Sequence, residues 1–288
     1  MWLHRHNRQP FRNASSGDED TNTPSAEPGE GKSQEYFPSL WDVLRVRFLL
    51  QWKVTEGLPA ELVDAIVDAA EYWPSSVTSM KEPTNRIIYQ DRDQVLLKTV
   101  PLCYDRKSLE RSPTTSRPLP HRTAHPCRKI VFHLSSHDQG RGPRRENMYE
   151  SSWTWFDTEV VPKAHERNMY ANGEEQDLLE NEHGQTSRHF NPDDRLLLPR
   201  DNKLQVNGSR VSEVQNVEII WHYLDKISPD SPLAYDIERT QGRGRSTLDG
   251  RAVRELEIGD SIALWARARF PQWSNHVSSA QIRVCWAV

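Results

Sequence analysis

The sequence predicts a mainly β protein, an antiparallel β-sandwich of jelly-roll type with a short N-terminal helix pair. Residues 261–270 and 281–288 alternate apolar and polar side chains, which is the two-residue period of a strand. The other strand-like segments are joined by polar loops and not by helices, so the βαβ units of a parallel sheet are excluded. Because each strand has one aliphatic face, two packed sheets are favoured over a closed barrel.

Composition along the chain predicts three parts. Residues 1–36 have almost no aliphatic side chains and are predicted to be disordered, because they cannot bury enough surface to offset the entropy of ordering. Residues 37–83 are predicted to be a helical leader that packs on the sandwich, since so short a helix pair has little core of its own. The sandwich is predicted over residues 84–288, with three long polar insertions at about 104–126, 163–193 and 226–247.

The leader carries the signals of two helices. Ser39 is a predicted N-cap, and apolar residues then recur at helical spacing up to residue 52. The chain breaks at 57–58, and Pro59 is well placed at the start of a second helix over 60–71. One face of that helix is expected to pack inward and its acidic side chains to point outward. The inward face comprises Leu62, Ile66, Ala69 and Ala70, and the acids are Asp64, Asp68 and Glu71.

Strands are predicted where β-branched and aromatic residues cluster between turn residues. The segments 86–89 and 94–100 are expected to form a hairpin, and Gly259-Asp260 is expected to be the turn of another hairpin. Further strands are expected at 129–134, 152–161, 195–198, 203–206 and 216–223. In the last two strands of the chain, the residues expected to be buried are Leu264, Phe270, Val284 and Trp286.

Two aromatic faces have more than one interpretation. Trp265, Arg267 and Arg269 share a strand face that is expected to lie outside or to pair with acids, because unpaired guanidinium groups are costly to bury. Trp153 and Trp155 also share one face. They are either a platform on which a sugar ring stacks or part of the core, and the core is favoured.

Composition and charge narrow the classes of partner and the cellular locations to be expected. A net charge of −4 and an isoelectric point near 6.3 argue against nucleic acid as a partner of the whole chain. Cys103, Cys127 and Cys285 are odd in number and widely spaced, which predicts free thiols in a reducing compartment. Neither a signal peptide nor a membrane-spanning apolar run is recognised, so a cytoplasmic or nuclear protein without a membrane partner is expected.

No catalytic residue, cofactor or metal is predicted. The sequence has no phosphate-binding loop, no CxxC pair, and no Ser-His-Asp or Cys-His arrangement with a known signature. His133, His137 and Asp138 are metal-ligand types, but their spacing along a strand separates the two imidazoles. A turn at the strand end is the better interpretation of these residues. A non-enzymatic protein is therefore favoured, and an enzyme is not ruled out.

Loops that join the two sheets are the expected place for a small ligand, if the sandwich binds one. Two polar loops around 137–140 and 272–276 carry aromatic or imidazole side chains. The ligand-binding candidates are His137, Asp138, Gln139, Trp273, Asn275 and His276. For Trp273, a role as a cap of the core is favoured over a role in binding.

Several blocks of the sequence resemble a family of uncharacterised fungal proteins. They are Gly57–Asp64, Ala70–Trp73, Ser135–Gly140, Ser152–Phe156 and the strands that contain Trp221, Trp265 and Trp286. The resemblance extends over residues 57–288 with gaps at the insertions. It implies a short helical leader followed by a galactose-binding-like β-sandwich, and it implies no particular activity.

The segment Leu58-Pro59-x-Glu61-Leu62-Val63-x-x-Ile66 also resembles the opening of an F-box, the helical motif that docks adaptors onto a ubiquitin ligase. This resemblance implies that Leu58, Pro59, Leu62 and Ile66 dock a protein partner. The expected function is a non-enzymatic interaction or ligand-binding module of unknown specificity. Two alternatives stay open: an F-box-like ubiquitin-ligase substrate adaptor, and a carbohydrate-binding or metal-dependent enzyme domain.

Overall fold

The computed structural model describes residues 36–54, 56–81, 84–89, 93–112, 115–141, 147–150, 152–166 and 203–288. Phe37–Val288 make up one compact unit. The segment 1–36 that was expected to be disordered lies outside the described residues apart from Tyr36. The predicted strand 195–198 and most of the insertion 163–193 also lie outside them.

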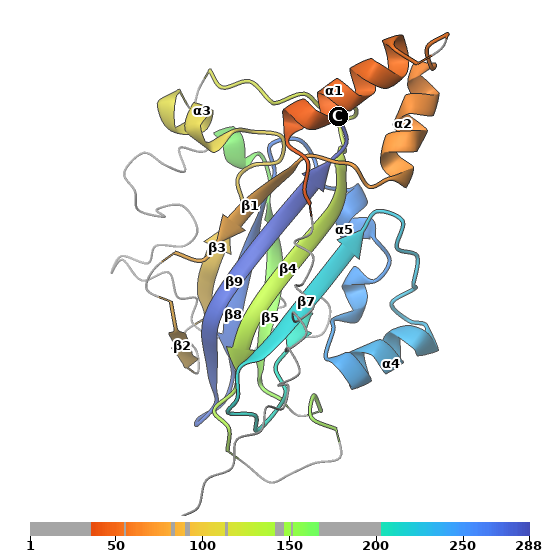
Figure 1. The fold of residues 1–288 in the computed structure, drawn as a ribbon. Coiled ribbons are helices and arrows are strands. Elements are labelled where there is room, and N and C mark those ends of the chain that lie inside the picture. The colour runs from red at the N-terminus through yellow and green to blue at the C-terminus, as the bar shows by residue number, and fades with distance from the viewer. Residues whose placement is uncertain are drawn as a thin grey trace, which may run out of the picture. The chain divides into compact units, whose positions relative to one another are not determined.

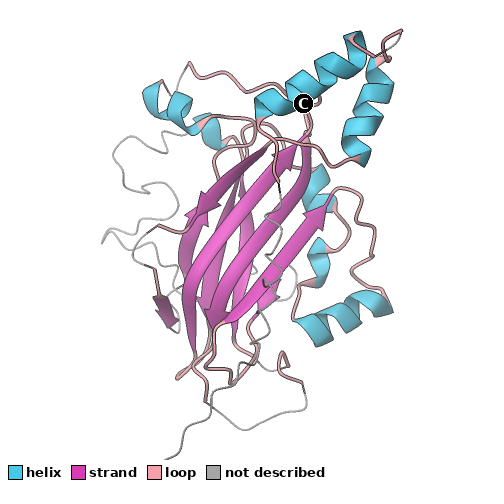
Figure 2. Ribbon diagram, viewed as in Figure 1, coloured by secondary structure: helices cyan, strands magenta, loops and turns pink. Residues whose placement is uncertain are grey.

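Nine described strands form two sheets (Figure 1). They are β1 (Ser75–Ser79), β2 (Arg86–Tyr89), β3 (Gln94–Lys98), β4 (Cys127–His137), β5 (Thr154–Val161), β6 (Lys203–Val206), β7 (Gln215–His222), β8 (Ser261–Ala268) and β9 (Ser274–Trp286). One sheet has the order β1-β9-β4-β7, with β2 also paired to β9, and the other has the order β3-β8-β5-β6. Their strand pairs are antiparallel, and strands dominate the unit (Figure 2), so the predicted mainly β, antiparallel class is confirmed.

The main core lies between the two sheets. Phe132 and Ile282 of one sheet and Phe156 and Leu264 of the other belong to the same buried cluster. In β8 the side chains alternate, because Leu264 faces this core while Trp265 belongs to a second, smaller buried cluster. The two-residue period predicted for this strand is confirmed, and the strand is buried on both faces.

Three of the four C-terminal residues expected in the core are buried, namely Leu264, Val284 and Trp286. The prediction for Phe270 is wrong, because this residue is 45% exposed. β8 ends at Ala268, and Phe270 has a φ of 70°, so the chain turns there and takes the ring off the core side of the sheet. The ring packs edge-on against Trp153, with centroids 4.7 Å apart.

The structure corrects one domain boundary and two predicted hairpins. β1 pairs with β9, so the sandwich begins before residue 84. β2 pairs with β9 and β3 pairs with β8, so these two strands lie in different sheets and do not form the predicted hairpin. The second predicted hairpin is also wrong. Residues 256–258 are not a strand, and Asp260 accepts hydrogen bonds from the Glu257 and Lys163 backbone amides to close a turn before β8.

Helices occupy two segments that were expected to be loops. The described helical segments are α1 (Leu40–Trp52), α2 (Ala60–Ala69), α3 (Arg106–Arg111), η1 (Ala164–Glu166), α4 (Pro232–Gln241), η2 (Arg245–Thr247) and α5 (Arg251–Arg254). The insertion 104–126 contains α3, which Asp105 caps, and the insertion 226–247 contains α4. α4 starts with a Ser231 cap before Pro232 and ends at Gly242 in the left-handed conformation. None of the described helices is long and apolar enough to cross a bilayer.

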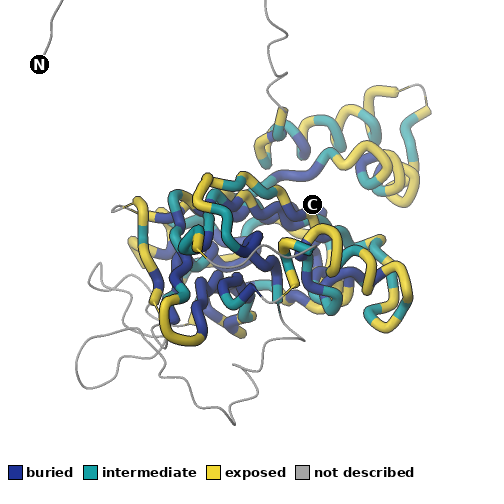
Figure 3. The backbone as a smooth tube through the Cα atoms, turned by 90° about the horizontal axis from the view of Figure 1, so that it is seen from below, coloured by how far each residue is buried: buried dark blue, intermediate teal, exposed yellow. Residues whose placement is uncertain are grey.

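The leader consists of α1 and α2. Ser39 forms the predicted cap, in a capping box with Asp42. Val63 and Val67 are the buried residues of α2, and they share the main core cluster with Trp286. The inward face predicted for α2 is wrong by one residue, because Leu62 and Ile66 are 53% and 44% exposed. In Figure 3 exposed positions recur along both leader helices, whereas most strand positions are buried.

Candidate functional site

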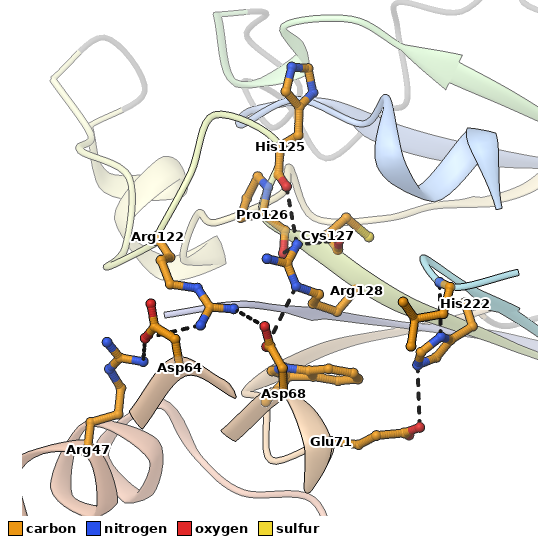
Figure 4. A network of polar contacts seen from close by, with 12 residues as sticks. Arg47, Asp64, Asp68, Glu71, Arg122, His125, Pro126, Cys127, Arg128 and His222 are labelled. Atoms are coloured by element: carbon orange, nitrogen blue, oxygen red, sulfur yellow. Dashed lines mark hydrogen bonds and ion pairs between the residues drawn. The ribbon is translucent and has the colours of Figure 1, made fainter. Parts of the chain in front are cut away.

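A network of ion pairs holds the leader to the loop before β4 (Figure 4). Asp64 and Asp68 lie one turn apart on α2, and Arg122 contacts both, at 3.1 Å from Asp64 and 2.5 Å from Asp68. Arg47 of α1 binds the same Asp64 carboxylate at 2.5 Å, so the network also joins the two helices. Asp64 and Asp68 were expected to point to solvent, but both are partly buried and form ion pairs with arginine.

The electrostatics of this network favour its charged form. Burial alone would raise the pKa of Asp64, but its hydrogen bonds to Arg47 and Arg122 outweigh burial and hold the pKa below its ordinary value. Burial alone would lower the pKa of Arg122, but Asp68 and Asp64 outweigh burial and raise it. Such partly buried, charge-assisted contacts are stronger than exposed ion pairs.

The C-terminal end of α2 is fixed in the same way. Glu71 lies 2.9 Å from Lys129 of β4 and 3.3 Å from His222 of β7. The Trp73 indole N–H donates to Asp68 at 2.8 Å, and its ring packs against His222 with centroids 5.8 Å apart. The leader is therefore fixed to the sandwich by both polar and aromatic contacts.

The outward side of α1 is aromatic. Trp41, Phe48 and Trp52, here called the aromatic stripe, lie at positions i, i+7 and i+11, which is one line along a helix. Their exposures are 77%, 52% and 71%. Val43, on the opposite side of α1, is fully buried. This helix is thus apolar on two opposite sides, and sequence reasoning did not separate them.

The partner-docking candidates of α2 are partly accessible. Leu62 and Ile66 point outward, and Pro59 is exposed. Leu58 is half-buried and packs on the main core, so it contributes to the fold. Three of these four candidates therefore lie on the solvent side of the leader.

The two loops expected to form a ligand-binding rim lie side by side. The Ser274 amide donates to the Gln139 side chain at 3.4 Å, and the imidazoles of His137 and His276 stack with centroids 4.6 Å apart. These two histidines are direct partners across β4 and β9. Burial lowers the pKa of His276, and the neighbouring His137 lowers it further. Trp273 in the same loop is half-buried.

Two of the six rim candidates are buried structural residues. Asp138 is fully buried and accepts backbone hydrogen bonds from Gly140, Arg210 and Val211. Asn275 is also fully buried, so neither side chain faces a ligand. Asp138 ties its loop to residues 210–211, a link that joins parts of the chain more than 70 residues apart and has no local sequence signal.

A buried polar network links the two sheets beside this rim, and sequence reasoning missed it. The Asn275 amide donates to the Trp155 and Arg267 carbonyls at 3.2 and 3.3 Å, and it accepts from Asn207 at 2.9 Å. Asn207 in turn donates to Thr154 and accepts from Ser136 at 2.8 Å. The described contacts therefore satisfy both asparagine side chains inside the sandwich.

The outer face of β8 carries a buried ion-pair cluster. Arg267 lies 2.6 Å from Asp93 and also binds Asp157, as expected for a guanidinium that is not solvated. Burial raises the pKa of Asp157 to about 6, although the charge of Arg267 opposes this shift. On the same face, Trp155 is 2% exposed and has two cations over its ring, so it is not an open sugar-stacking platform.

The described residues contain no group of three His, Cys, Asp or Glu side chains able to hold a metal ion. His133 is exposed and lies 3.5 Å from Glu218, and it pairs with Gln281 of β9, whereas His137 pairs with His276. Cys103, Cys127 and Cys285 are buried free thiols, and burial raises the pKa of Cys103 to about 12. Such a thiol is a poor nucleophile at neutral pH.

Comparison of the chain with models of known protein families, with curated proteins and with solved structures finds no match.

Proposed function

We propose that this chain is a non-enzymatic interaction module whose leader binds a protein partner through the aromatic stripe of α1. The observation that carries the proposal is the second apolar side of this helix. A surface helix of a globular domain normally has one apolar face, which packs on the core. Here Val43 and Leu50 take that role, yet Trp41, Phe48 and Trp52 remain exposed. Exposed aromatic clusters mark interaction surfaces, where they supply most of the binding free energy.

A positive charge beside the aromatic stripe indicates the chemistry of the partner. Arg45 lies between Trp41 and Phe48 on the same side of α1, is exposed, and has no ion pair in the described part of the chain. An amphipathic segment with apolar side chains around a carboxylate would complement this surface. We therefore propose an acidic, amphipathic helix of a partner protein as the occupant.

The ion-pair network supports this role because it fixes the helix that bears the stripe. Arg47 is on the inner side of α1 and binds Asp64, which Arg122 links to the sandwich. A helix held in this way loses little conformational entropy when it binds.

An F-box-like ubiquitin-ligase substrate adaptor is the second candidate, and a different observation favours it. Leu62 and Ile66, which the F-box resemblance assigns to docking, point outward from α2. In this version the leader docks on a ligase adaptor subunit, and the sandwich presents the substrate.

Family and location belong to the same proposal. The family proposal rests on the sequence resemblance, and the blocks at 57–64 and 70–73 agree with the short helical leader that it implies, because they form α2 and the segment after it. The three free thiols support a cytoplasmic or nuclear location, where thiols stay reduced.

The stripe is tested with the full-length protein and a displayed library of acidic amphipathic helical peptides. We expect the selected peptides to bind at least about 10-fold more weakly when Trp41, Phe48 and Trp52 are all changed to Ser. Arg45→Glu should weaken acidic peptides further. The matched control is Leu224→Ser with Leu233→Ser, two leucines that are 56% and 55% exposed elsewhere on the chain. Equal binding by the stripe variant and the control would contradict the proposal.

The adaptor candidate needs a separate measurement with a purified ligase adaptor subunit. Binding to the wild-type chain that is lost in Leu62→Ser with Ile66→Ser, and kept in the stripe variant, would favour the adaptor. No binding by the wild-type chain would remove this candidate and leave the interaction module.

A further inference from the structure

We propose that a pocket beside the part of β5 that β6 leaves unpaired among the described residues binds a neutral, hydroxyl-rich small molecule, that is, a saccharide or polyol. The pocket has a volume of about 520 Å³, within the range of about 300–1,000 Å³ that small-molecule sites occupy. Its lining includes none of the rim candidates. It is also independent of the aromatic stripe, so it goes beyond the proposed function.

In the described part of the chain, β6 covers only part of β5. β6 pairs with β5 at residues 155–157, and β5 continues to Val161. Along this uncovered stretch the pocket is lined by Thr158 and Val160, and its other walls come from β7, β8, η2 and α5. In Figure 1 the segment that carries α4 and α5 lies on the β7 side of the unit.

Two buried polar atoms of the lining residues point to a ligand. The Trp221 indole nitrogen and the Ser246 hydroxyl are buried and have no hydrogen-bond partner among the described residues. Trp221 is 3% exposed, so its N–H is removed from bulk water. A buried donor without a partner costs free energy, and native structures leave few of them. A ligand hydroxyl accepts from the indole and both donates to and accepts from the serine.

The charges of the pocket argue against an anionic ligand. Arg267 is paired with Asp157, and Arg251 is paired with Glu255 at 2.7 Å. Glu159 accepts a hydrogen bond at 2.9 Å from an indole of β8. Each arginine thus has an acidic partner within the chain, and an anionic ligand would lose its hydration without gaining a new counter-charge. The carboxylates still have oxygens that accept hydrogen bonds from hydroxyl groups.

The remaining lining is apolar. Trp221, Val160, Leu256 and Ile262 supply an aromatic and aliphatic wall. A sugar ring has an apolar C–H side and a rim of hydroxyl groups, so it matches an apolar wall with a few polar groups. Ligand pockets generally have this composition.

The test is a titration of the full-length protein with D-glucose, D-galactose, D-mannose, N-acetyl-D-glucosamine and myo-inositol, followed by saturation-transfer NMR and calorimetry. We expect at least one of them to bind. Ser246→Ala and Trp221→Phe each remove one hydrogen-bonding atom, which should weaken binding by about 5- to 10-fold. Val160→Trp fills the pocket mouth and should abolish binding. Because the Ser246 hydroxyl has no partner within the described residues, Ser246→Ala should not lower the melting temperature.

Two controls separate the pocket from other sites. Ser279→Ala alters an exposed serine of β9, and Trp273→Phe removes an indole N–H at the rim, so both should bind like the wild type. The proposal is overturned by any of three results. The first is that none of the sugars or polyols binds at a concentration of about 10 mM, at which a ligand with a millimolar dissociation constant would be mostly bound. The second is that glucose 6-phosphate binds more tightly than glucose. The third is that Val160→Trp and Trp221→Phe, both shown to be folded by their melting temperatures, bind the ligand like the wild type.

Discussion

Individual buried polar residues help to determine how the two sheets of the sandwich pack on each other. Asn275 is fully buried and donates to carbonyls of two different strands, Trp155 in β5 and Arg267 in β8. Asn275 itself belongs to β9 in the other sheet, so this one amide links the two sheets. Its role is therefore structural, although it lies beside residues that remain ligand-binding candidates.

Asn275→Ala should lower the free energy of unfolding by about 2–3 kcal/mol, because two buried carbonyls and the Asn207 amide lose a partner. Asn216→Ala is the matched control, since this exposed asparagine accepts one hydrogen bond from Ser135 at the surface. The control should change stability by less than about 0.5 kcal/mol. Urea unfolding of both variants measures the difference, and equal stabilities would show that the network is not a stabilising one.

Asp157 should give the protein an unusual pH dependence. Its pKa is raised from 3.8 to about 6 in the folded state, so between these values the folded protein holds a proton that the unfolded chain has released. Stability from this group is thus present at low pH and falls as the pH rises from about 4 to about 6, by on the order of 2–3 kcal/mol.

The check is urea unfolding of the wild type and Asp157→Asn across this pH window. The variant should gain stability relative to the wild type as the pH rises, because its amide has no charge to bury. Asp64→Asn is a control of opposite sign. The pKa of Asp64 is lowered, so its contribution is present at neutral pH and is lost on acidification. Parallel stability curves for the wild type and Asp157→Asn would show that Asp157 does not titrate in this window.

At the scale of elements, one arginine fork contributes strongly to the position of α2. Arg122 reaches two carboxylates one turn apart on this helix, so it positions the helix along its axis as well as holding it. A lysine has no such fork and cannot replace it.

Arg122→Met should therefore loosen the leader while leaving the sheets intact. We expect amide hydrogen exchange in residues 60–69 to accelerate by roughly 5- to 30-fold, which corresponds to about 1–2 kcal/mol. Arg122→Lys should behave similarly. Arg117→Met, at an exposed position of the same loop, should have no effect. Equal acceleration in β4 and β9 would mean that the leader does not open separately from the sheets.

Elements with strong local periodicity could be predicted from the sequence, whereas features that depend on contacts between distant segments could not. The alternation in β8 and the cap at Ser39 are local signals, and both were read correctly. The inward face of α2 was placed one residue away, because Leu62 and Val63 are both apolar and only the contacts of α2 with the rest of the fold select between them. α4 had readable signals in Ser231-Pro232 and Gly242, and they were overlooked in a polar segment.

The candidate sites follow the same division. The rim loops were predicted to form one site because loops that join the two sheets are the usual place for a ligand, and the pairing of β4 with β9 brings them together. The burial of Asp138 depends on residues 210–211 and carries no sequence signal. The aromatic stripe and the β5 pocket were missed for a related reason. An apolar residue on a helix suggests burial, and only the fold shows which side of the helix the core occupies.

For the molecule as a whole, one core joins the leader to both sheets. Val43, Val63 and Val67 of the helices belong to the same buried cluster as Trp286, which is near the end of β9. The Trp286 indole also donates to the Pro120 carbonyl at 3.2 Å, in the loop that carries Arg122. The described part of the chain is therefore expected to lose the leader helices and the strands in one cooperative transition.

Trp286→Ala and Trp41→Ala form a matched pair that tests this expectation. Trp286 is 4% exposed, and its loss from the core should cost about 3–5 kcal/mol. Trp41 is 77% exposed, and its loss should change stability by less than about 0.5 kcal/mol while weakening peptide binding at the stripe. Circular dichroism and tryptophan fluorescence should give coincident urea midpoints for both variants. Separate midpoints in Trp286→Ala would show that the leader and the sandwich are two cooperative units, and a large loss of stability in Trp41→Ala would place the stripe in the core.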